Sequence, residues 1–267
     1  MNSLIQECQI ALHARRFIIE AVRADYKSRF TDSMLGALWM ILNPLALVAL
    51  YTFVLSIILA AKLPGIAHAY AYPVYLISGL IGWTLFSEVL MRSSQVFCEF
   101  SPLFKKTTVP VLAYFCIVIV TGYVNAFLLW LASLAILFLL GFPVTKWILL
   151  VPLLLGLTAL FGAGLGAVLS VFQVFAKDIS QALPILVQLL FWLTPIVYTF
   201  EMIPADIARF AIYHPFAPLI GLFHNTIAYG EPPNAAYLLV YASVTTAIWW
   251  MFLRVYSRAE SELLDAL

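Results

Sequence analysis

Charged residues are scarce in this sequence, and their scarcity indicates the solvent in which the chain folds. They make up 10% of the 267 residues, whereas hydrophobic residues make up 64%. Ordinary soluble domains carry roughly a quarter charged residues, and a water-soluble fold of this size cannot bury so much apolar surface. Lipid is the better solvent, and there a spanning helix needs about 20 mostly apolar residues. The composition therefore predicts an all-α, multi-pass membrane protein.

Motifs for covalent, metal and nucleotide chemistry are also missing. Cys8, Cys98 and Cys116 form no CxxC pair and no metal-like spacing with the four histidines, so we expect neither a disulfide framework nor a metal site. No Gly-Lys pair occurs in the chain, which excludes a Walker-type phosphate loop. No Ser/His/Asp or Cys/His order stands out. We expect no catalytic residue, no cofactor in this chain and no nucleic-acid partner.

The first thirty residues are polar and lack an uninterrupted apolar core, so no cleaved signal peptide is expected. At 100° per residue, one side of this segment is apolar and the opposite side is charged. The apolar side carries Ile10, Ala14, Phe17, Ile18 and Ala21, and the charged side carries Arg16, Glu20, Arg23 and Lys27. This pattern predicts an amphipathic helix in the cytoplasmic interface, within a segment 1–32. An ordinary solvated juxtamembrane helix is the alternative.

Charge-free intervals set the expected number of spans. The interval 210–230 contains Pro215, Pro218 and His224, which suit re-entrant or interfacial helices better than a span. It belongs to an outer segment of about 201–234. The other six intervals predict six transmembrane helices within 33–254, followed by a tail 255–267. These intervals are 33–61, 63–87, 107–145, 147–176, 179–200 and 232–253.

The distribution of cations supports six spans with both termini in the cytoplasm. Only Lys62, Lys146 and Arg209 of the 14 Lys and Arg residues then lie outside, as the positive-inside rule expects. A seventh span would move Arg254 and Arg258 outside. The long interval 107–145 is predicted to be a single helix ending near residue 140, because turn residues appear only at "GFPVTK".

Two polar features stand out on the expected inner side. Glu88 precedes Arg92 by four residues near the inner end of the second span, a spacing that favours a helical ion pair; a structural and a functional role both remain open. The loop of about 93–110 contains Ser101 and Pro102, which can start a short helix. Such a helix suits docking of a soluble partner, and a simple basic loop is the alternative.

Aromatic residues make up 15% of the chain, and many occur at positions expected inside the bilayer. Taken singly, each suits a membrane-interface belt or helix packing. Collectively, they offer apolar faces along which sugar rings can slide.

The run "RADYKSRFTDSMLGALWMILNPL" resembles the N-terminal signature of polysaccharide-exporting ABC permeases of the type-2 exporter class. In that signature an R-D-x-K-x-R-Y-like run leads into S-x-L-G-x-x-W-x-x-L-x-P. The matching residues are Arg23, Asp25, Lys27, Arg29, Ser33, Leu35, Gly36, Trp39, Leu42 and Pro44, and Phe30 replaces the usual Tyr. "LTPIVYTFEMIP", 193–204, also resembles the end of the family's fifth span, so the likeness covers nearly the whole chain.

The resemblance implies a function and a set of partners. The chain would be the non-enzymatic permease subunit of a bacterial inner-membrane exporter, working as a homodimer with two cytoplasmic ATP-binding subunits that hold the ATP and Mg²⁺. It would move lipid-linked polysaccharide: O-antigen first, with capsule and teichoic acid as the other choices. An integral membrane enzyme acting on lipid-linked sugars is the alternative, but the acids Glu88, Glu99 and Asp178 are scattered along the chain.

The resemblance also implies roles for residues. The coupling helix would comprise Phe100, Ser101, Pro102, Leu103, Phe104, Lys105 and Lys106. Candidates to line the glycan path are Trp39, Asn43, Tyr51, Trp83, Phe86, Glu88, Trp192 and Tyr198. We add the hypothesis that Arg16, Arg23, Lys27 or Arg29 holds the lipid pyrophosphate, because cations concentrate beside the first span and interfacial Lys and Arg attract phosphate.

Overall fold

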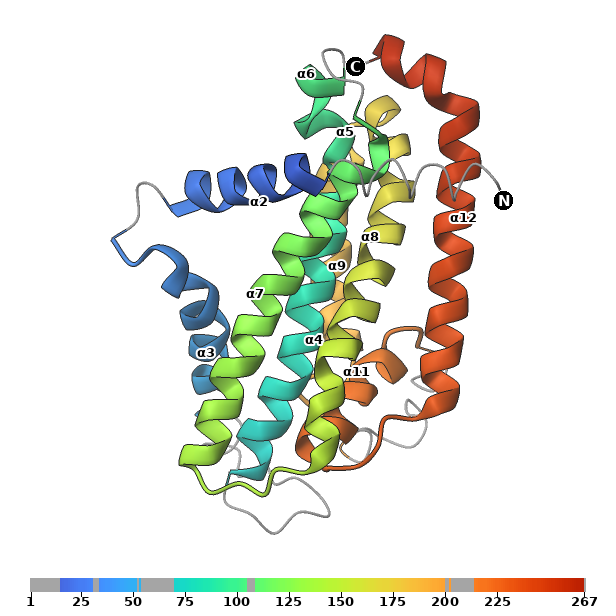
Figure 1. The fold of residues 1–267 in the computed structure, drawn as a ribbon. Coiled ribbons are helices and arrows are strands. Elements are labelled where there is room, and N and C mark those ends of the chain that lie inside the picture. The colour runs from blue at the N-terminus through green and yellow to red at the C-terminus, as the bar shows by residue number, and fades with distance from the viewer. Residues whose placement is uncertain are drawn as a thin grey trace.

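The computed structural model describes residues 15–30, 34–51, 53, 70–104, 109–199, 202 and 214–266. All regular elements in these ranges are helices. Four long helices run side by side: α4 (Ala71–Ser94), α7 (Val111–Leu139), α8 (Val151–Phe175) and α12 (Ala235–Ala266). Helix α2 (Arg15–Phe30) lies across one end of this bundle (Figure 1). The expectation of an all-α protein is confirmed for the described ranges.

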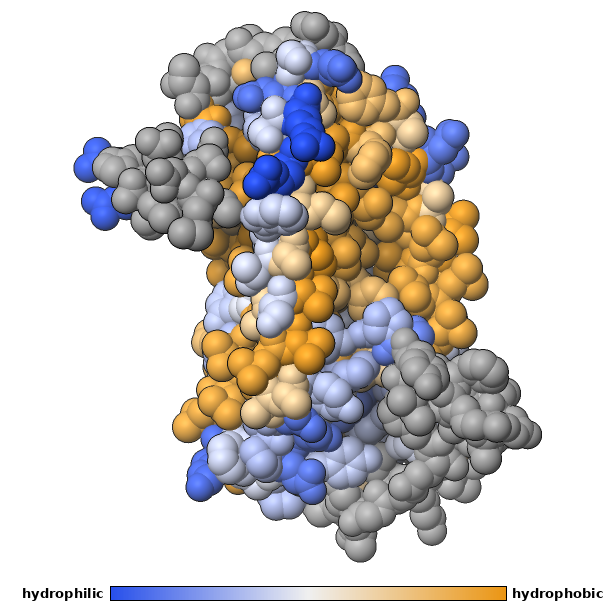
Figure 2. Space-filling view, turned by 90° about the vertical axis from the view of Figure 1, so that its right-hand side faces the viewer, coloured by the Kyte–Doolittle hydropathy of each residue, from blue (hydrophilic) through white to orange (hydrophobic). Residues whose placement is uncertain are grey.

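Four segments are long and apolar enough to cross a membrane: Ala71–Ser94, Val111–Leu139, Lys146–Phe175 and Ala235–Leu263. The third of these joins the short helix η3 (Lys146–Leu150) to α8. Figure 2 shows a hydrophobic surface across the middle of the molecule, with hydrophilic residues gathered mainly toward its two ends. This distribution suits a protein that spans a bilayer.

The predicted first and fifth spans are represented by shorter helices, α3 (Trp39–Tyr51) and α9 (Ile179–Leu193). The 15 residues of α9 rise about 22 Å, less than the roughly 30 Å of a hydrocarbon core. Thr194 adopts an extended conformation because it precedes Pro195, and proline disfavours the α conformation in the residue before it. Continuation of α3 beyond residue 53 lies outside the described residues, so the count of six stays a prediction.

Helix α7 is the single long helix that the sequence predicts. It ends at Leu139, and Gly141 follows with a φ of +65°. The amide of Phe142 donates to the carbonyl of Leu137 at 3.0 Å, which closes the helix as C-terminal glycines commonly do.

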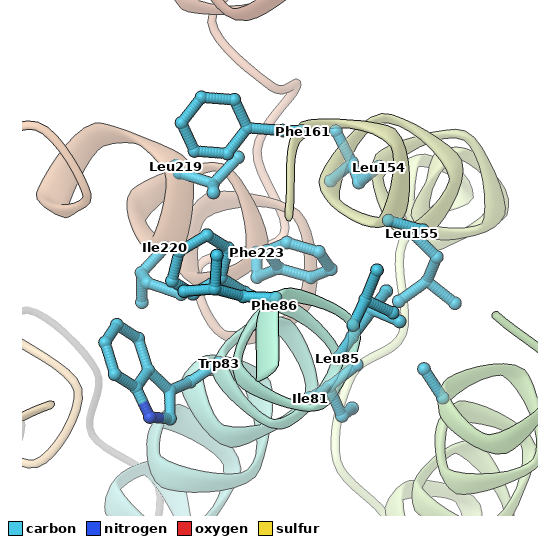
Figure 3. Close-up of a cluster of buried hydrophobic side chains, with 14 of the residues drawn as sticks. Ile81, Trp83, Leu85, Phe86, Leu154, Leu155, Phe161, Leu219, Ile220 and Phe223 are labelled. Carbon is cyan, nitrogen blue, oxygen red and sulfur yellow. The ribbon is translucent and has the colours of Figure 1, made fainter. Parts of the chain in front are cut away.

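Helix α4 is the centre of the core. It packs against α3, α7, α8, α9, α11 (Ala217–Phe223) and the π-helix η5 (His224–Ala228). Figure 3 shows the large side chains that fill the space between α4, α8 and α11, among them Phe86, Phe161 and Phe223. At the α4–α8 contact a Cβ on Gly166 would lie 2.6 Å from the Leu90 carbonyl oxygen, so the absence of a side chain lets the two backbones approach.

Two short helices, α5 (Val96–Glu99) and α6 (Ser101–Phe104), follow α4 at the end where α2 lies (Figure 1). The ring of Phe97 stacks on that of Tyr256 in α12, with 5.9 Å between centroids, and meets Phe115 of α7 edge-on at 6.1 Å. Helix α12 continues unbroken past residue 254, and Leu263 near its end is 1% exposed. The division into a membrane domain 33–254 and a tail 255–267 stays a prediction.

Candidate functional site

Helix α2 has two unlike sides, as the amphipathic pattern predicts. Phe17, Ile18 and Ala21 are partly buried against the core, whereas Arg16, Glu20, Arg23 and Lys27 are exposed. Arg23 Nη1 forms an ion pair with Glu20 Oε1 at 2.7 Å. The side chain of Arg29 lies outside the described part of the chain. The exposed side therefore offers positive charge without contributing to the core.

The inward side of α2 carries a tyrosine that joins a polar network between α4 and α7. Tyr26 Oη donates to Asn125 Oδ1 at 2.7 Å and lies 3.1 Å from the Thr121 carbonyl oxygen. Asn125 Nδ2 in turn donates to Glu88 Oε1 at 2.9 Å. These bonds connect α2 to both long helices, and they satisfy polar groups that are costly to leave unpaired in an apolar interior.

An ion pair reinforces the same contact. Arg92 Nη2 of α4 lies 3.0 Å from Asp25 Oδ1 of α2, and the side chains are 16% and 17% exposed. The sequence suggested that Arg92 would pair with Glu88 instead. The structure differs because α2 crosses the C-terminal end of α4 and brings a carboxylate from outside the helix, whereas an i,i+4 pair is worth only about 0.2–0.5 kcal/mol.

The short helix predicted to start at Ser101 and Pro102 is present as α6, with Pro102 exposed in its first turn; its docking role stays a prediction. The rings of Phe100 and Phe104 lie 5.2 and 4.5 Å from that of Tyr114 in α7. Helix α6 thus rests on the bundle through aromatic contacts. The side chain of Leu103, and all of Lys105 and Lys106, lie outside the described residues.

The candidates for a glycan path fall into two groups. Trp83 and Phe86 are 5% and 0% exposed; Trp83 packs on Phe191 and Phe86 packs on Phe216. In this structure both side chains are enclosed in the core, and their expected place along a glycan path stays a prediction. Glu88 is partly buried in the network with Asn125.

Other candidates lie on the surface of the chain. Trp39 and Asn43 of α3 are exposed, as is Trp192 of α9. Tyr198 is half-buried, with its hydroxyl 2.9 Å from the carbonyl oxygens of both Trp192 and Leu193. The side chain of Tyr51 lies outside the described residues. An exposed amide within an apolar helix needs a polar neighbour, so Asn43 favours a surface that meets water, substrate or another chain.

The opposite end of the bundle contains a buried histidine that the sequence placed only in a loop or interface. His224 lies outside the four spanning helices, and its ring stacks on Tyr75 of α4 with 3.7 Å between centroids. His224 Nε2 donates to the Pro195 carbonyl oxygen at 3.1 Å, and its Nδ1 lies 2.8 Å from Ser78 Oγ. A carbonyl only accepts, so the proton of the neutral ring is on Nε2 and Nδ1 is an acceptor. The single hydroxyl proton of Ser78 is shared between Nδ1 and the Tyr75 carbonyl oxygen, which lies 2.7 Å from Ser78 Oγ. The residue joins η5, α4 and the turn after α9.

Mild acid should therefore destabilise the end of the bundle that contains His224. Burial lowers the pKa of His224 below its ordinary 6.5, so below about pH 6.5 the unfolded chain binds a proton that the folded chain does not. Stability present above that pH is lost as the pH falls, by about 2 kcal/mol at pH 5. We expect the melting temperature to drop between pH 7 and 5, and to drop less in His224→Gln. His214, whose pKa burial also lowers, leaves a smaller residual slope. Parallel pH profiles of the two proteins would contradict this assignment.

Within the described residues, no group of three His, Cys, Asp or Glu side chains is placed to hold a metal ion. The structure brings together the cationic helix α2 across one end of the bundle, the short helix α6 beside it and a core of helices long enough to cross a membrane. These features define a polytopic helical membrane protein.

The family follows from comparison with known proteins. Residues 17–228 match the family model described as ABC-2 type transporter, and the chain belongs to that family. It is 27% identical over 208 residues to the O-antigen export system permease protein RfbA of Klebsiella pneumoniae, covering 76% of each chain. It is 24% identical to the protein of the same name from Myxococcus xanthus, covering 95% of this chain and 96% of the relative. It is also 24% identical to the polysialic acid transport protein KpsM of Escherichia coli, covering 91% and 93%.

Proposed function

We propose that this chain is the permease subunit of an ATP-driven exporter of lipid-linked polysaccharide in the bacterial inner membrane. The observation that carries the proposal is the family match over residues 17–228, together with relatives named for O-antigen and polysialic acid export that align over most of their length. O-antigen is the substrate we put first, because three of the five relatives carry that name.

The energy for export would come from two separate ATP-binding subunits on the cytoplasmic side, where both termini of this chain would also lie. Helix α6 supports this role, because Pro102 is exposed while Phe100 and Phe104 seat the helix on Tyr114 of α7. A partner pressing on α6 would move a segment that is packed against the bundle. The chain would hydrolyse no nucleotide itself.

A second copy of the chain would complete the transport path. Helices α3 and α9 both pack on α4, and both leave large apolar side chains exposed, including Trp39, Leu42, Leu189 and Trp192. The exposed amide of Asn43 lies on the same short helix as Trp39. Aromatic rings and a polar group on such a surface suit contact with sugar rings.

The exposed cations of α2 would bind the pyrophosphate of the lipid carrier. Arg16 and Arg23 are two turns apart on the exposed side, and charge-assisted bonds from guanidinium to phosphate are strong. We expect Arg16→Gln with Arg23→Gln to reduce export of lipid-linked polysaccharide about tenfold or more, because each interfacial cation attracts phosphate by about 1 kcal/mol. Export is measured in vesicles that contain the chain and its partner ATP-binding subunit.

Two further measurements separate the parts of this proposal. The variant should still copurify with the ATP-binding subunit, since neither arginine contributes to the core. Lys146→Gln, at an exposed position outside α2, should export normally. Normal export by the α2 double variant would contradict the pyrophosphate role alone. If the unaltered chain neither bound an ATP-binding partner nor exported polysaccharide, the proposed function itself would be contradicted.

A further inference from the structure

Helix α12 has one side that the rest of the described chain leaves uncovered. It packs on α8 and α11, and Trp250, Met251, Arg254 and Arg258 are exposed. Figure 2 looks onto the α12 side of the molecule and shows hydrophilic residues near its upper end, above a hydrophobic stretch. The outer side of α12 therefore changes from apolar to basic along its length.

The length of the apolar part places that change at a membrane surface. Residues 235–253 contain no charged side chain and rise about 28 Å as a helix, close to the roughly 30 Å thickness of the hydrocarbon. Arg254 follows directly. It lies at the same end of the bundle as α5, because Tyr256, two residues later, stacks on Phe97. Arg254 is thus at headgroup level in the leaflet on the side of α2, α5 and α6.

A hollow lies at this level. It is lined by Trp250, Met251, Arg254, Val255 and Arg258 and has a volume of about 260 Å³. That is slightly below the roughly 300–1,000 Å³ of sites that enclose a drug-sized ligand, and it suits a headgroup whose acyl chains remain outside. The guanidinium of Arg254 lies 5.0 Å from the centroid of the Trp250 ring, a cation–π contact that holds the cation in place.

Two cationic residues border the hollow, whose own lining is mainly apolar, and their charge favours an anion beside it. Arg254 and Arg258 are one helical turn apart, and neither forms an ion pair with a carboxylate within the described ranges. Glu260 accepts a hydrogen bond from Tyr256 at 3.2 Å, on the side that meets α5. Glu262 lies one turn beyond Arg258 and limits the basic surface to the end nearer the hydrocarbon. Two guanidinium groups can share the oxygens of one phosphate.

We propose that this hollow binds the phosphate headgroup of an anionic phospholipid. The phosphate lies between Arg254 and Arg258, and an acyl chain runs along the exposed apolar side chains of Met251 and Val244. A lipid fits better than a soluble phosphate compound because the wall formed by Trp250 and Met251 is apolar and continues into the hydrocarbon-facing surface. The lipid would brace the part of α12 whose Tyr256 packs on α5.

Native mass spectrometry of the purified full chain tests this proposal. The chain is exposed to micelles containing equal amounts of phosphatidylglycerol and phosphatidylcholine, and the first lipid retained is identified. We expect roughly a tenfold preference for phosphatidylglycerol, since each interfacial arginine adds substantially to attraction. Arg254→Gln with Arg258→Gln should bring the ratio close to one, and Arg254→Lys with Arg258→Lys should retain much of the preference.

Matched variants distinguish a built site from general attraction. Lys146→Gln with Lys177→Gln removes two exposed cations elsewhere and should leave the ratio unchanged. Trp250→Ala keeps both arginines but removes the apolar wall, and should lower the ratio several-fold. The proposal is overturned if the arginine double variant keeps the full preference while remaining helical and monodisperse. It is equally overturned if Lys146→Gln with Lys177→Gln lowers the lipid preference as much as the arginine double variant does. Displacement of the lipid by inorganic phosphate would also overturn it.

Discussion

Alanine at Gly166 is expected to destabilise the protein by about 3 kcal/mol, because it inserts a methyl group where two helix backbones touch. A Cβ at this position would lie 2.5 Å from Ser93 Cβ and 2.6 Å from the Leu90 carbonyl oxygen. Helix α4 cannot easily retreat, since α7 and α3 also pack on it. A lower melting temperature, followed by tryptophan fluorescence in detergent, is the measurement.

Gly156 provides the matched control in the same helix. The nearest atom to a Cβ built there is Tyr123 Cε2 at 4.0 Å, so alanine meets no obstacle and improves helix propensity by up to about 1 kcal/mol. Gly156→Ala should melt at the unaltered temperature or slightly above. If both alanine variants melted alike, the close α4–α8 approach would not be a determinant of stability.

Removal of Arg92 is expected to cost about 3 kcal/mol, because it takes away the guanidinium that lies 3.0 Å from the partly buried carboxylate of Asp25, and breaking a buried ion pair costs several kcal/mol. Arg92→Gln should lower the melting temperature and release α2 from the bundle. Limited proteolysis near residue 30 reports that release. Asp25→Asn with Arg92→Gln should recover part of the loss, since the double variant no longer buries the Asp25 charge beside a removed cation.

The exposed pair on the same helix is the comparison. Arg23 and Glu20 are 71% and 69% exposed, and solvent-exposed ion pairs contribute about 0–1 kcal/mol. Arg23→Gln should therefore change the melting temperature little. Equal losses in Arg92→Gln and Arg23→Gln would show that burial does not distinguish the two pairs.

The ends of the long helices were predictable because the sequence marks them. Turn residues occur after Leu140 but not within the preceding run, so α7 was predicted as one helix and found as Val111–Leu139. The early end of α9 also had a local signal, the proline after Thr194, but a charge-free interval is insensitive to it. The length of a charge-free interval reports only how long the chain stays hydrophobic. The helix ends earlier, where Thr194 leaves the α conformation.

The polar contact was less predictable because its partners come from different helices. The i,i+4 spacing of Glu88 and Arg92 was visible, but the position of Asp25 beside Arg92 depends on how α2 crosses the bundle. Asn125 gave one usable signal, since an amide in a long apolar helix requires a partner. Trp83 and Phe86 gave no such signal, because the sequence alone does not show whether an aromatic residue in a span faces the core or a transport path.

The stacking of Phe97 on Tyr256 joins residues that are 159 positions apart. A ribosome adding about 5–20 residues per second takes roughly 10 to 30 s to cover that distance. Throughout that interval the nascent chain lacks one aromatic partner for α5. The surface next to α6 thus reaches its final form only after α12 has been synthesised. A partner that recognises the finished surface could then bind only after α12 has been synthesised. Chains that end before α12 would not bind such a partner.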